Sequence, residues 1–301
     1  MNVFVAGASG AIGLPLVREL IRQGHAVTGM TRSEGGAKNL ARIGAVVAHV
    51  SAFDAAGVDT ALRRSKAEVV IDQLTALPKN PDDMPDAASG NQKLRLEGGG
   101  NLYRAARACG VRRYMQQSSG FFLRPGEGLA DESEGLATGA SPEVAADAQT
   151  YAELEARVLA GGMEGIALRY GFDYGPGTWF HPDGAYADQV RRQEFPIIGA
   201  GSGVWSWVHI EDAARATVAA LSAPPGVYHI VDDTPSSVSV WLPAFARAVG
   251  APPPPRVTEA EALAAAGEDA VYYGTKLRGA SNAKARRTLG FAPRRLEWLR
   301  A

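Results

Sequence analysis

Cysteine is almost absent from this chain of 301 residues, in which Cys109 is the only one. A single cysteine excludes a disulfide within the chain, and this usage fits a reducing cytoplasm. No local base accompanies Cys109 in the stretch "ARACGVRRY". A small packing residue at the end of a helix is therefore a better interpretation than a reactive nucleophile.

Long apolar runs and a surplus of charge are also missing. No apolar run reaches the ~18 residues that a membrane-spanning helix needs, and the start "MNVFVAGASG" lacks the basic segment of a secretion signal. The formal net charge of -1 gives no electrostatic attraction to nucleic acid or to an anionic membrane. No set of His, Cys, Asp and Glu has the spacing of metal ligands. We therefore expect a cytoplasmic protein that acts on a small-molecule substrate, with no nucleic acid, membrane or metal partner.

Short apolar runs alternate with helical patterns through the first half of the chain. This spacing predicts an α/β fold, with a parallel sheet covered by helices on both faces. A long helix is expected at Asn91–Cys109, and the stretch Gly126–Ala148 is interpreted as a surface loop. The expected strands are Asn2–Ala6, 26–30, Val46–Val50, Glu68–Leu74, Arg112–Gln117 and Gly165–Tyr170.

The first expected strand runs directly into the glycine pattern "GASGAIG" at the start of a helix. Glycines at this spacing allow a tight turn and let the backbone approach a pyrophosphate, which the helix N-terminus then attracts. Strand before and helix after make this context specific for a dinucleotide, although a tight turn for packing alone would use the same residues. The residues expected to bind the cofactor here are Gly7, Ser9, Gly10, Ala11, Ile12 and Gly13.

The second expected strand ends in "GMTRS", where an NAD site carries an acid that binds the ribose 2′-hydroxyl. Arg32 and Ser33 stand there instead, and a guanidinium can form a forked ion pair with a 2′-phosphate. The sequence therefore favours NADP(H) over NAD(H). The alternative is that Arg32 is an ordinary exposed arginine.

Five segments, in the right order along nearly the whole chain, carry a family resemblance. They are "GASGAIG", "EGGGNLYRAARACGVRRYMQQSSG", "LRYGFDYGPG", "WSWVHIEDAARA" and "SNAKARRTLGF". Together they resemble the extended short-chain dehydrogenase/reductase superfamily, the NAD-dependent epimerase/dehydratase group. The resemblance implies a Rossmann-type doubly wound sheet with a smaller C-terminal substrate domain across a cleft, and a possible homodimer. On this basis the dinucleotide-binding domain comprises residues 1–170 plus about 204–232, and the substrate domain comprises about 171–203 plus 233–301.

The same resemblance implies a catalytic set of Ser or Thr, Tyr and Lys. Ser119 matches the serine that orients the substrate oxygen, with Ser118 beside it, and Tyr151 matches the acid/base tyrosine. Glu155 stands where the lysine is expected, so this chain departs from the family pattern at a catalytic position. The cofactor contacts implied by the resemblance also include Leu74 and Ser118.

A glutamate in place of that lysine changes the expected chemistry. Tyr151 and Glu155 share one helix face, and a nearby carboxylate raises a tyrosine pKa where an ammonium would lower it. Tyr151 should then stay protonated, able to donate to a carbonyl oxygen but poor as a base for alcohol oxidation. Lys93 or Arg95 could compensate from the long helix, although a solvated helix face is the simpler interpretation, and Arg169 is expected to be structural or near the cofactor.

These features favour an NADP(H)-dependent oxidoreductase that reduces a small carbonyl compound, or an epimerase/dehydratase-like enzyme. Two alternatives stay open: a nicotinamide-binding redox sensor without hydride turnover, and a non-redox lyase or isomerase on the same fold. Tyr151 could also match the family position by coincidence. Aromatic residues in the second half are candidates for the substrate pocket, with packing between domains as the alternative. The candidates are Tyr174, Trp179, His181 and Trp205.

Overall fold

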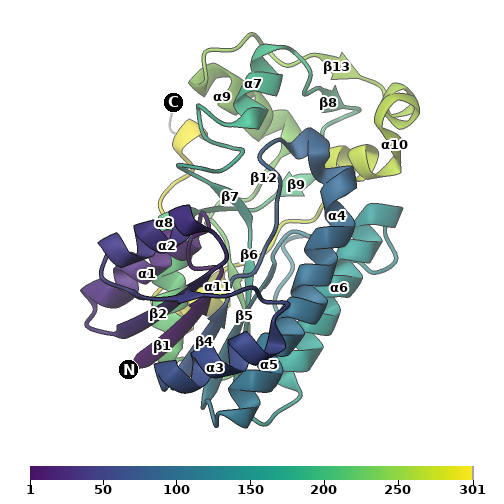
Figure 1. Ribbon diagram of the computed structural model, residues 1–301. Helices are drawn as coiled ribbons and strands as arrows, with labels where there is room; N and C mark the ends of the chain where they lie inside the picture. Colours follow the sequence, from purple (N-terminus) through teal and green to yellow (C-terminus); the bar gives the residue numbers. More distant parts are fainter. Residues whose placement is uncertain (300–301) are drawn as a thin grey trace.

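A computed structural model describes residues 1–299 and shows a central parallel sheet (Figure 1). Its seven strands lie in the order β11-β6-β5-β4-β1-β2-β3, and every neighbouring pair is parallel. The strands are β1 (Asn2–Ala6), β2 (Ala26–Thr31), β3 (Val46–His49), β4 (Val69–Asp72), β5 (Arg113–Ser119), β6 (Glu164–Tyr170) and β11 (Gly226–Ile230). This order, which turns back at β1 and β4, confirms the predicted Rossmann-type doubly wound fold.

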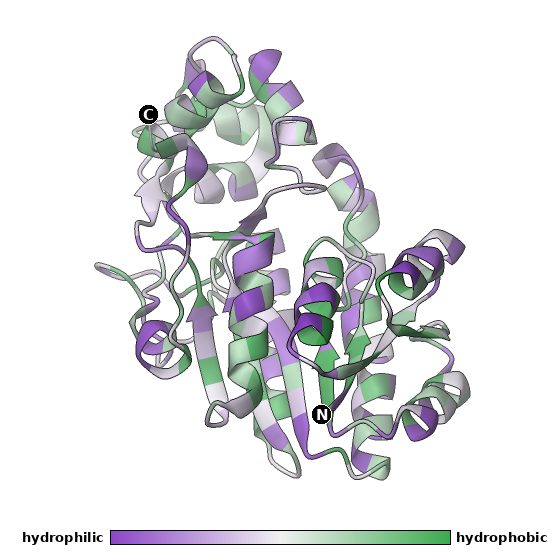
Figure 2. Cartoon of the chain, turned by 90° about the vertical axis from the view of Figure 1, so that its left-hand side faces the viewer, coloured by the Kyte–Doolittle hydropathy of each residue, from purple (hydrophilic) through white to green (hydrophobic). Residues whose placement is uncertain are grey.

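Helices cover both faces of the sheet because the inner strands bury side chains on both sides. One apolar core joins Val3 and Val5 to the first group of helices, and a second joins Phe4 and Ala6 to the other group. Figure 2 shows the apolar strands between helices that are polar on their outer sides. The first group is α1 (Gly13–Arg22), α2 (Glu34–Arg42), α8 (Ile210–Ala219) and α11 (Ala283–Leu289), and the second is α3 (Ala55–Ser65), α5 (Gly99–Ala108) and α6 (Pro142–Leu159).

The predicted long helix begins earlier than Asn91 and is not uniform. It consists of α4 (Met84–Lys93), a π-helical stretch over Leu94–Gly98, and α5, preceded by a 3-10 turn at Pro81–Asp83. A π-helical stretch inserts one residue into the helical ladder and re-aims the side chains near it. The pattern of apolar residues alone does not show such an insertion.

The predicted loop Gly126–Ala148 is wrong at its end, because α6 already begins at Pro142. The carboxylate of Asp269 accepts hydrogen bonds from the hydroxyl of Ser141 and from the backbone N–H groups of Glu143 and Val144. A carboxylate from another helix therefore caps α6, which satisfies N–H groups that the helix cannot pair itself.

Several elements of the second half lie above the carboxyl ends of the sheet strands (Figure 1), whereas β6, α8, β11 and α11 belong to the sheet and its covering helices. Three two-stranded ribbons form there: β7 with β10, β9 with β12, and β8 with β13. The elements of this region are β7 (Phe172–Tyr174), α7 (Ala185–Arg191), β8 (Ile197–Ile198), β9 (Val204–Trp205), β10 (Trp207–His209), β12 (Ser236–Ser237), α9 (Val238–Ala248), β13 (Arg256–Val257), α10 (Glu259–Thr275) and a 3-10 turn at Glu297–Leu299. The 3-10 turn Ala220–Ser222 continues α8 beside the sheet. The predicted domain boundaries stay a prediction.

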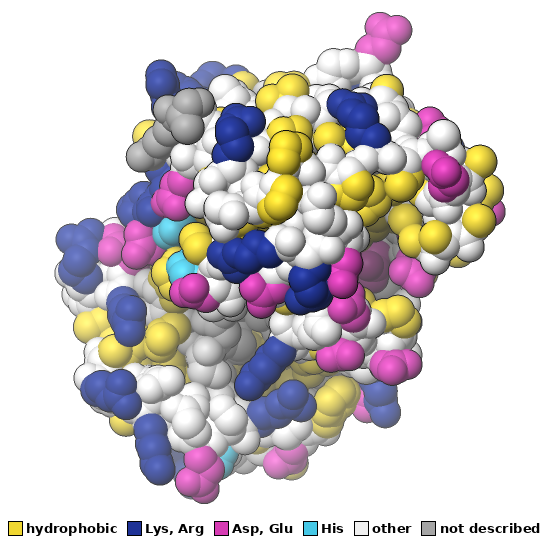
Figure 3. Space-filling model, turned by 90° about the horizontal axis from the view of Figure 1, so that it is seen from above, with side chains coloured by type: hydrophobic (Ala, Val, Ile, Leu, Met, Phe, Trp, Pro, Cys, Tyr) yellow, Lys and Arg dark blue, Asp and Glu magenta, His cyan; other side chains and the backbone are white. Residues whose placement is uncertain are grey.

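The core of this upper region is aromatic. Trp205, Trp207, Trp241, Phe245 and Trp298 are all buried in one cluster. Figure 3 shows that Lys and Arg side chains are interspersed with Asp and Glu over the face seen from above. Within residues 1–299, no helix has both the length and the apolar character needed to cross a bilayer.

Candidate active site

The glycine loop brings β1, α1 and the end of β4 closer together than any other residue type would allow. Gly7 has a φ of 72°, and a Cβ added there would lie 2.3 Å from the carbonyl oxygen of Gln73. A Cβ on Gly13 would lie 2.2 Å from the carbonyl oxygen of Gly7. Both positions therefore require glycine, and the exposed backbone of the loop is free to approach a ligand.

The start of α1 fits the anionic part of a dinucleotide. No side chain caps the helix at Ile12, and no acidic residue lies in its first turn. The positive end of the helix dipole is thus left for a phosphate. Ser9, Ala11 and Gly10 complete the loop, with Gly10 donating its N–H to the carbonyl of Gly7 at 3.0 Å.

The end of β2 fits a 2′-phosphate. Arg32 and Ser33 are both exposed at the carboxyl end of β2, beside the glycine loop, where the hydroxyls of Ser9 and Thr31 lie 2.9 Å apart. Ser33 caps α2 by accepting the N–H of Gly36 at 3.1 Å. The guanidinium of Arg32 forms no ion pair among residues 1–299, so it is free to meet an anion.

Ser119 lies at the carboxyl end of β5 with its hydroxyl held in place. Its oxygen accepts the backbone N–H groups of Phe121 and Phe122, each at 3.3 Å. Because both contacts are accepted, the hydroxyl hydrogen of Ser119 stays available to a substrate oxygen. Ser118 is used differently: it donates to the carboxylate of Glu155 at 2.6 Å.

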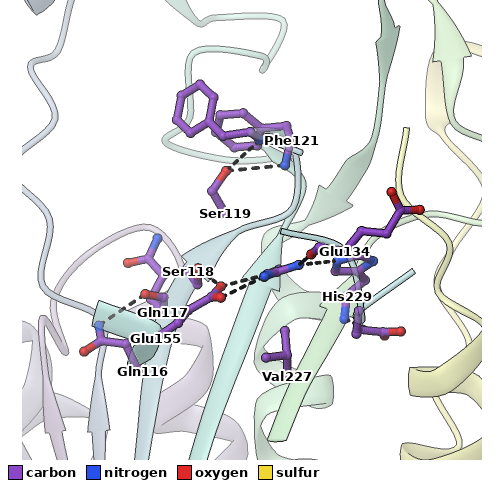
Figure 4. A network of polar contacts seen from close by, with 12 residues as sticks. Gln116, Gln117, Ser118, Ser119, Phe121, Glu134, Glu155, Val227 and His229 are labelled. Carbon is purple, nitrogen blue, oxygen red and sulfur yellow. Dashed lines mark hydrogen bonds and ion pairs between the residues drawn. The ribbon is translucent and has the colours of Figure 1, made fainter. Parts of the chain in front are cut away.

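Glu155 is part of a buried ion pair rather than a free carboxylate (Figure 4). Arg169 donates its Nε to one carboxylate oxygen at 2.7 Å and its Nη2 to the other at 2.8 Å. The side chains of Arg169 and Glu155 are 4% and 9% exposed. A forked pair of this kind is strong and fixes both partners.

The sheet explains why these groups meet. Ser118, Arg169 and His229 are register partners on the adjacent strands β5, β6 and β11. Arg169 Nη1 donates to the Nε2 atom of His229 at 3.2 Å, and the Nδ1 atom of His229 donates to the carbonyl of Ser281 at 3.2 Å. Burial, together with the charge of Arg169, lowers the pKa of His229 to about 3, so this imidazole is neutral.

The pKa of the Tyr151 phenol lies above its ordinary value, as expected, but Glu155 is not among the causes. Burial is the main reason that the pKa of the Tyr151 phenol lies above its ordinary value. Arg95 opposes this shift, and the carboxylates of Asp147 and Asp173 add to it. The charge of Glu155 is balanced by Arg169, so the raised pKa of Tyr151 follows mainly from the burial of its ring.

The two cations proposed on the long helix differ. Lys93 is exposed and pairs with Glu97 at 3.7 Å, so it lies on a solvated face. Arg95 is buried, which corrects the simpler interpretation of a solvated face. Its guanidinium carbon lies 4.7 Å from the ring centroid of Tyr151.

The four aromatic and histidine candidates are not equally placed. Tyr174 is buried against His209 and Trp298, at 5.0 Å between ring centroids in each case. Trp205 is buried and stacks on Phe172 at 4.0 Å. Trp179 donates to the carbonyl of Pro78 at 3.1 Å, and His181, partly exposed, lies 3.6 Å from Asp183.

Sequence reasoning missed three partly exposed aromatic rings near Ser119, namely Phe121, Phe172 and Tyr273. Phe121 stacks on Phe172 at 4.0 Å, which links the end of β5 to the upper region. The phenylalanine doublet in "GFF", after the serine pair, was the available signal.

Leu74 is buried at the end of β4, and the thiol of Cys109 is partly buried with a pKa raised by burial. Across residues 1–299, no three metal-ligating side chains lie close enough to hold an ion.

Comparison with known proteins decides the family. Residues 3–230 match the model of the NAD-dependent epimerase/dehydratase family. The chain belongs to that family. It is also similar to a 3-diazoavenalumate denitrifying reductase from a Streptomyces species, at 41% identity over 301 residues, covering 99% of this chain and 98% of the relative.

Solved structures of this family have the same fold. A Thermus thermophilus UDP-glucose 4-epimerase determined with NAD has a TM-score of 0.75 at 24% identity, covering 99% of this chain and 96% of that one. A Streptomyces venezuelae dTDP-glucose 4,6-dehydratase determined with NAD has a TM-score of 0.76 at 19% identity, covering 99% and 93%. This member of the NAD-dependent epimerase/dehydratase family is thus an NAD(P)-dependent enzyme.

Proposed function

We propose that this enzyme is an NADPH-dependent reductase that delivers hydride to a small aromatic electrophile and does not oxidise alcohols. The observation that carries this proposal is Glu155, which stands in the position of the family lysine and is held by Arg169. No ammonium lies there to lower the pKa of Tyr151, and burial raises that pKa instead. A base for alcohol oxidation is therefore absent, whereas hydride delivery to an electrophile needs none.

An aryl diazonium is the substrate class that this site suits best. When bound, the reduced nicotinamide supplies a hydride, whose two electrons convert an aryl diazonium into an aryl diazene; loss of N2 then moves the N–H hydrogen to the ring carbon. This reaction protonates no oxygen atom, so the absence of the family lysine should not lower its rate. The relative whose name describes a denitrifying reduction of a diazo compound is 41% identical, which supports this choice.

A small carbonyl compound is the second candidate, and it rests on a separate observation. Ser119 has a hydroxyl hydrogen left to donate, and Tyr151 is protonated, so two donors could bind a carbonyl oxygen. The two candidates differ in their need for Tyr151. Carbonyl reduction should fall steeply in Tyr151→Phe, whereas diazonium reduction should keep most of its rate.

The test uses 4-carboxybenzenediazonium and the matched aldehyde 4-formylbenzoate with NADPH. Loss of nicotinamide absorbance and formation of benzoate or 4-(hydroxymethyl)benzoate are followed in the wild type and in Tyr151→Phe, after subtracting the reaction without enzyme. Benzoate formation that survives in Tyr151→Phe supports the diazonium proposal. If NADPH binds but neither compound is reduced, both the diazonium and the carbonyl proposals fail.

The preference for NADPH is tested by fluorescence titration with NADPH and NADH, in the wild type and in Arg32→Ala. We expect NADPH to bind at least about tenfold more tightly, roughly 1.4 kcal/mol, because Arg32 and Ser33 meet the 2′-phosphate. Arg32→Ala should remove that preference and leave NADH binding unchanged. Equal binding of the two cofactors by the wild type would contradict the proposal.

A further inference from the structure

Arg95 is a buried cation that forms no ion pair among residues 1–299. The residue is 5% exposed, and its Nη1 atom is buried with no hydrogen-bond acceptor among residues 1–299. No carboxylate of the described chain forms an ion pair with it. Two acids, Asp147 and Asp72, interact with Arg95 through their charge but form no ion pair with it. Asp72 already accepts from Tyr114 at 2.8 Å and from the N–H of Leu74 at 3.0 Å. A buried charge left in this state costs free energy, so its retention calls for a function.

The chain holds Arg95 in this place by several means. The π-helical stretch Leu94–Gly98 aims it inward, and such stretches are frequent at functional sites. Its guanidinium carbon lies 4.7 Å from the ring centroid of Tyr151. One turn earlier, Gln92 donates to Thr150 at 2.9 Å and ties α4 to α6 next to the tyrosine.

The anions of the cofactor have other expected partners. Its pyrophosphate is expected at the uncapped start of α1, and its 2′-phosphate at Arg32 and Ser33. Both of these expected phosphate sites follow β1 and β2, whereas Arg95 lies on the helix that precedes β5. The anion that Arg95 lacks should therefore arrive with the substrate, on the side of the site formed by Tyr151 and the aromatic rings of Phe122 and Tyr273.

We propose that Arg95 binds the carboxylate of an aromatic acid substrate. Its planar fork of N–H donors matches a carboxylate, and the neighbouring rings match an aromatic body. This inference rests on the proposed function and names the substrate class more closely. Two carboxylates near Tyr151, Asp147 and Asp173, make the rest of this side acidic, so Arg95 alone would select an anionic group.

The test is a binding measurement without turnover. Calorimetric titration of the NADP+-saturated enzyme with cinnamate and with uncharged cinnamamide should show at least about tenfold tighter binding of cinnamate. Arg95→Met should abolish this preference while NADP+ affinity stays within about twofold, and Arg95→Lys, which keeps the charge but loses the fork, should retain part of it. Because the charge is unpaired in the free protein, Arg95→Met should melt at the same temperature as the wild type or higher.

Three results would overturn the inference. Equal binding of cinnamate and cinnamamide by the wild type excludes a carboxylate subsite, and this arm needs no variant. A preference that persists in Arg95→Met assigns the carboxylate to another residue. A parallel loss of NADP+ affinity in Arg95→Met and Arg95→Lys assigns Arg95 to the cofactor. Failure of the hydride assays alone would leave these binding results standing, so the two proposals fail separately.

Discussion

The glycine loop matches the family pattern, whereas the polar row formed by Ser118, Glu155 and Arg169 departs from it at Glu155. At the loop, backbone atoms determine the residues: a Cβ at Gly7 or Gly13 would collide with a backbone carbonyl oxygen. At the polar row, side chains satisfy one another, with Glu155, Arg169 and Ser118 forming a closed set. A site made by the backbone keeps its sequence, whereas a site made by side chains can exchange one consistent set for another.

The exchange has a chemical consequence for this enzyme. A lysine at position 155 would be a cation available to the tyrosine and the cofactor. Glu155 instead uses its carboxylate oxygens to accept from Arg169 and Ser118 within the protein. We therefore expect this side of the site to have lost the cation that would lower the pKa of Tyr151, while the glycine loop keeps its geometry. Three predictions test this contrast.

The largest effect is expected from breaking the ion pair on one side. Arg169→Met leaves Glu155 buried without its cation, which should cost about 3–5 kcal/mol of unfolding free energy. Urea unfolding measures this loss. The matched double variant, Arg169→Met with Glu155→Met, should recover most of it, because two apolar side chains replace a complete pair. An Arg169→Met variant with the unfolding free energy of the wild type would show that the ion pair of Arg169 with Glu155 does not stabilise this part of the fold.

A smaller effect on stability, with a complete effect on binding, is expected at the loop. Gly13→Ala places a Cβ 2.2 Å from the carbonyl of Gly7, so the backbone must shift, at about 1–3 kcal/mol. NADPH titration should detect no binding to this variant. The control is Gly35→Ala on α2, where an added Cβ meets nothing within 4 Å. Normal NADPH affinity in Gly13→Ala would mean that the loop tolerates side chains and that the contrast is false.

The smallest effect at neutral pH concerns His229. Its folded-state pKa is depressed from 6.5 to about 3, so between these values the unfolded chain binds a proton that the folded chain does not. Because of this histidine, the unfolding free energy of the protein decreases as the pH falls through that window, by at most about 1.4 kcal/mol per pH unit. His229→Gln keeps a donor and an acceptor but cannot titrate. Its unfolding free energy should fall less than that of the wild type between pH 7 and pH 4.5, and parallel curves would refute a neutral buried histidine.

Local patterns were sufficient to predict the sheet, the glycine loop and the departure at Glu155. The partners of Glu155 were not predictable in the same way, because they depend on the register of β5, β6 and β11, which places Ser118 beside Arg169 and His229. The start of α6 depends on Asp269, more than 120 residues away in the sequence.

Arg95 shows a second limit of sequence reasoning. It was recognised as a cation that could face the cleft, but helical periodicity equally allowed a solvated face. The π-helical stretch decided between them, and its hydrogen-bond pattern has no plain signature in residues 94–98. Long-range register and helix irregularity, rather than residue type, are what the sequence left undetermined.

The tryptophans have an optical consequence. All five lie between Trp179 and Trp298, and four of them pack in the aromatic core of the upper region, so the seven-stranded sheet contains none. Intrinsic tryptophan emission therefore reports on the upper region alone, while far-ultraviolet circular dichroism is dominated by the sheet and its helices. Superimposed denaturation curves from the two signals would show that the two halves melt as one unit, and separated curves would show that each half has its own transition.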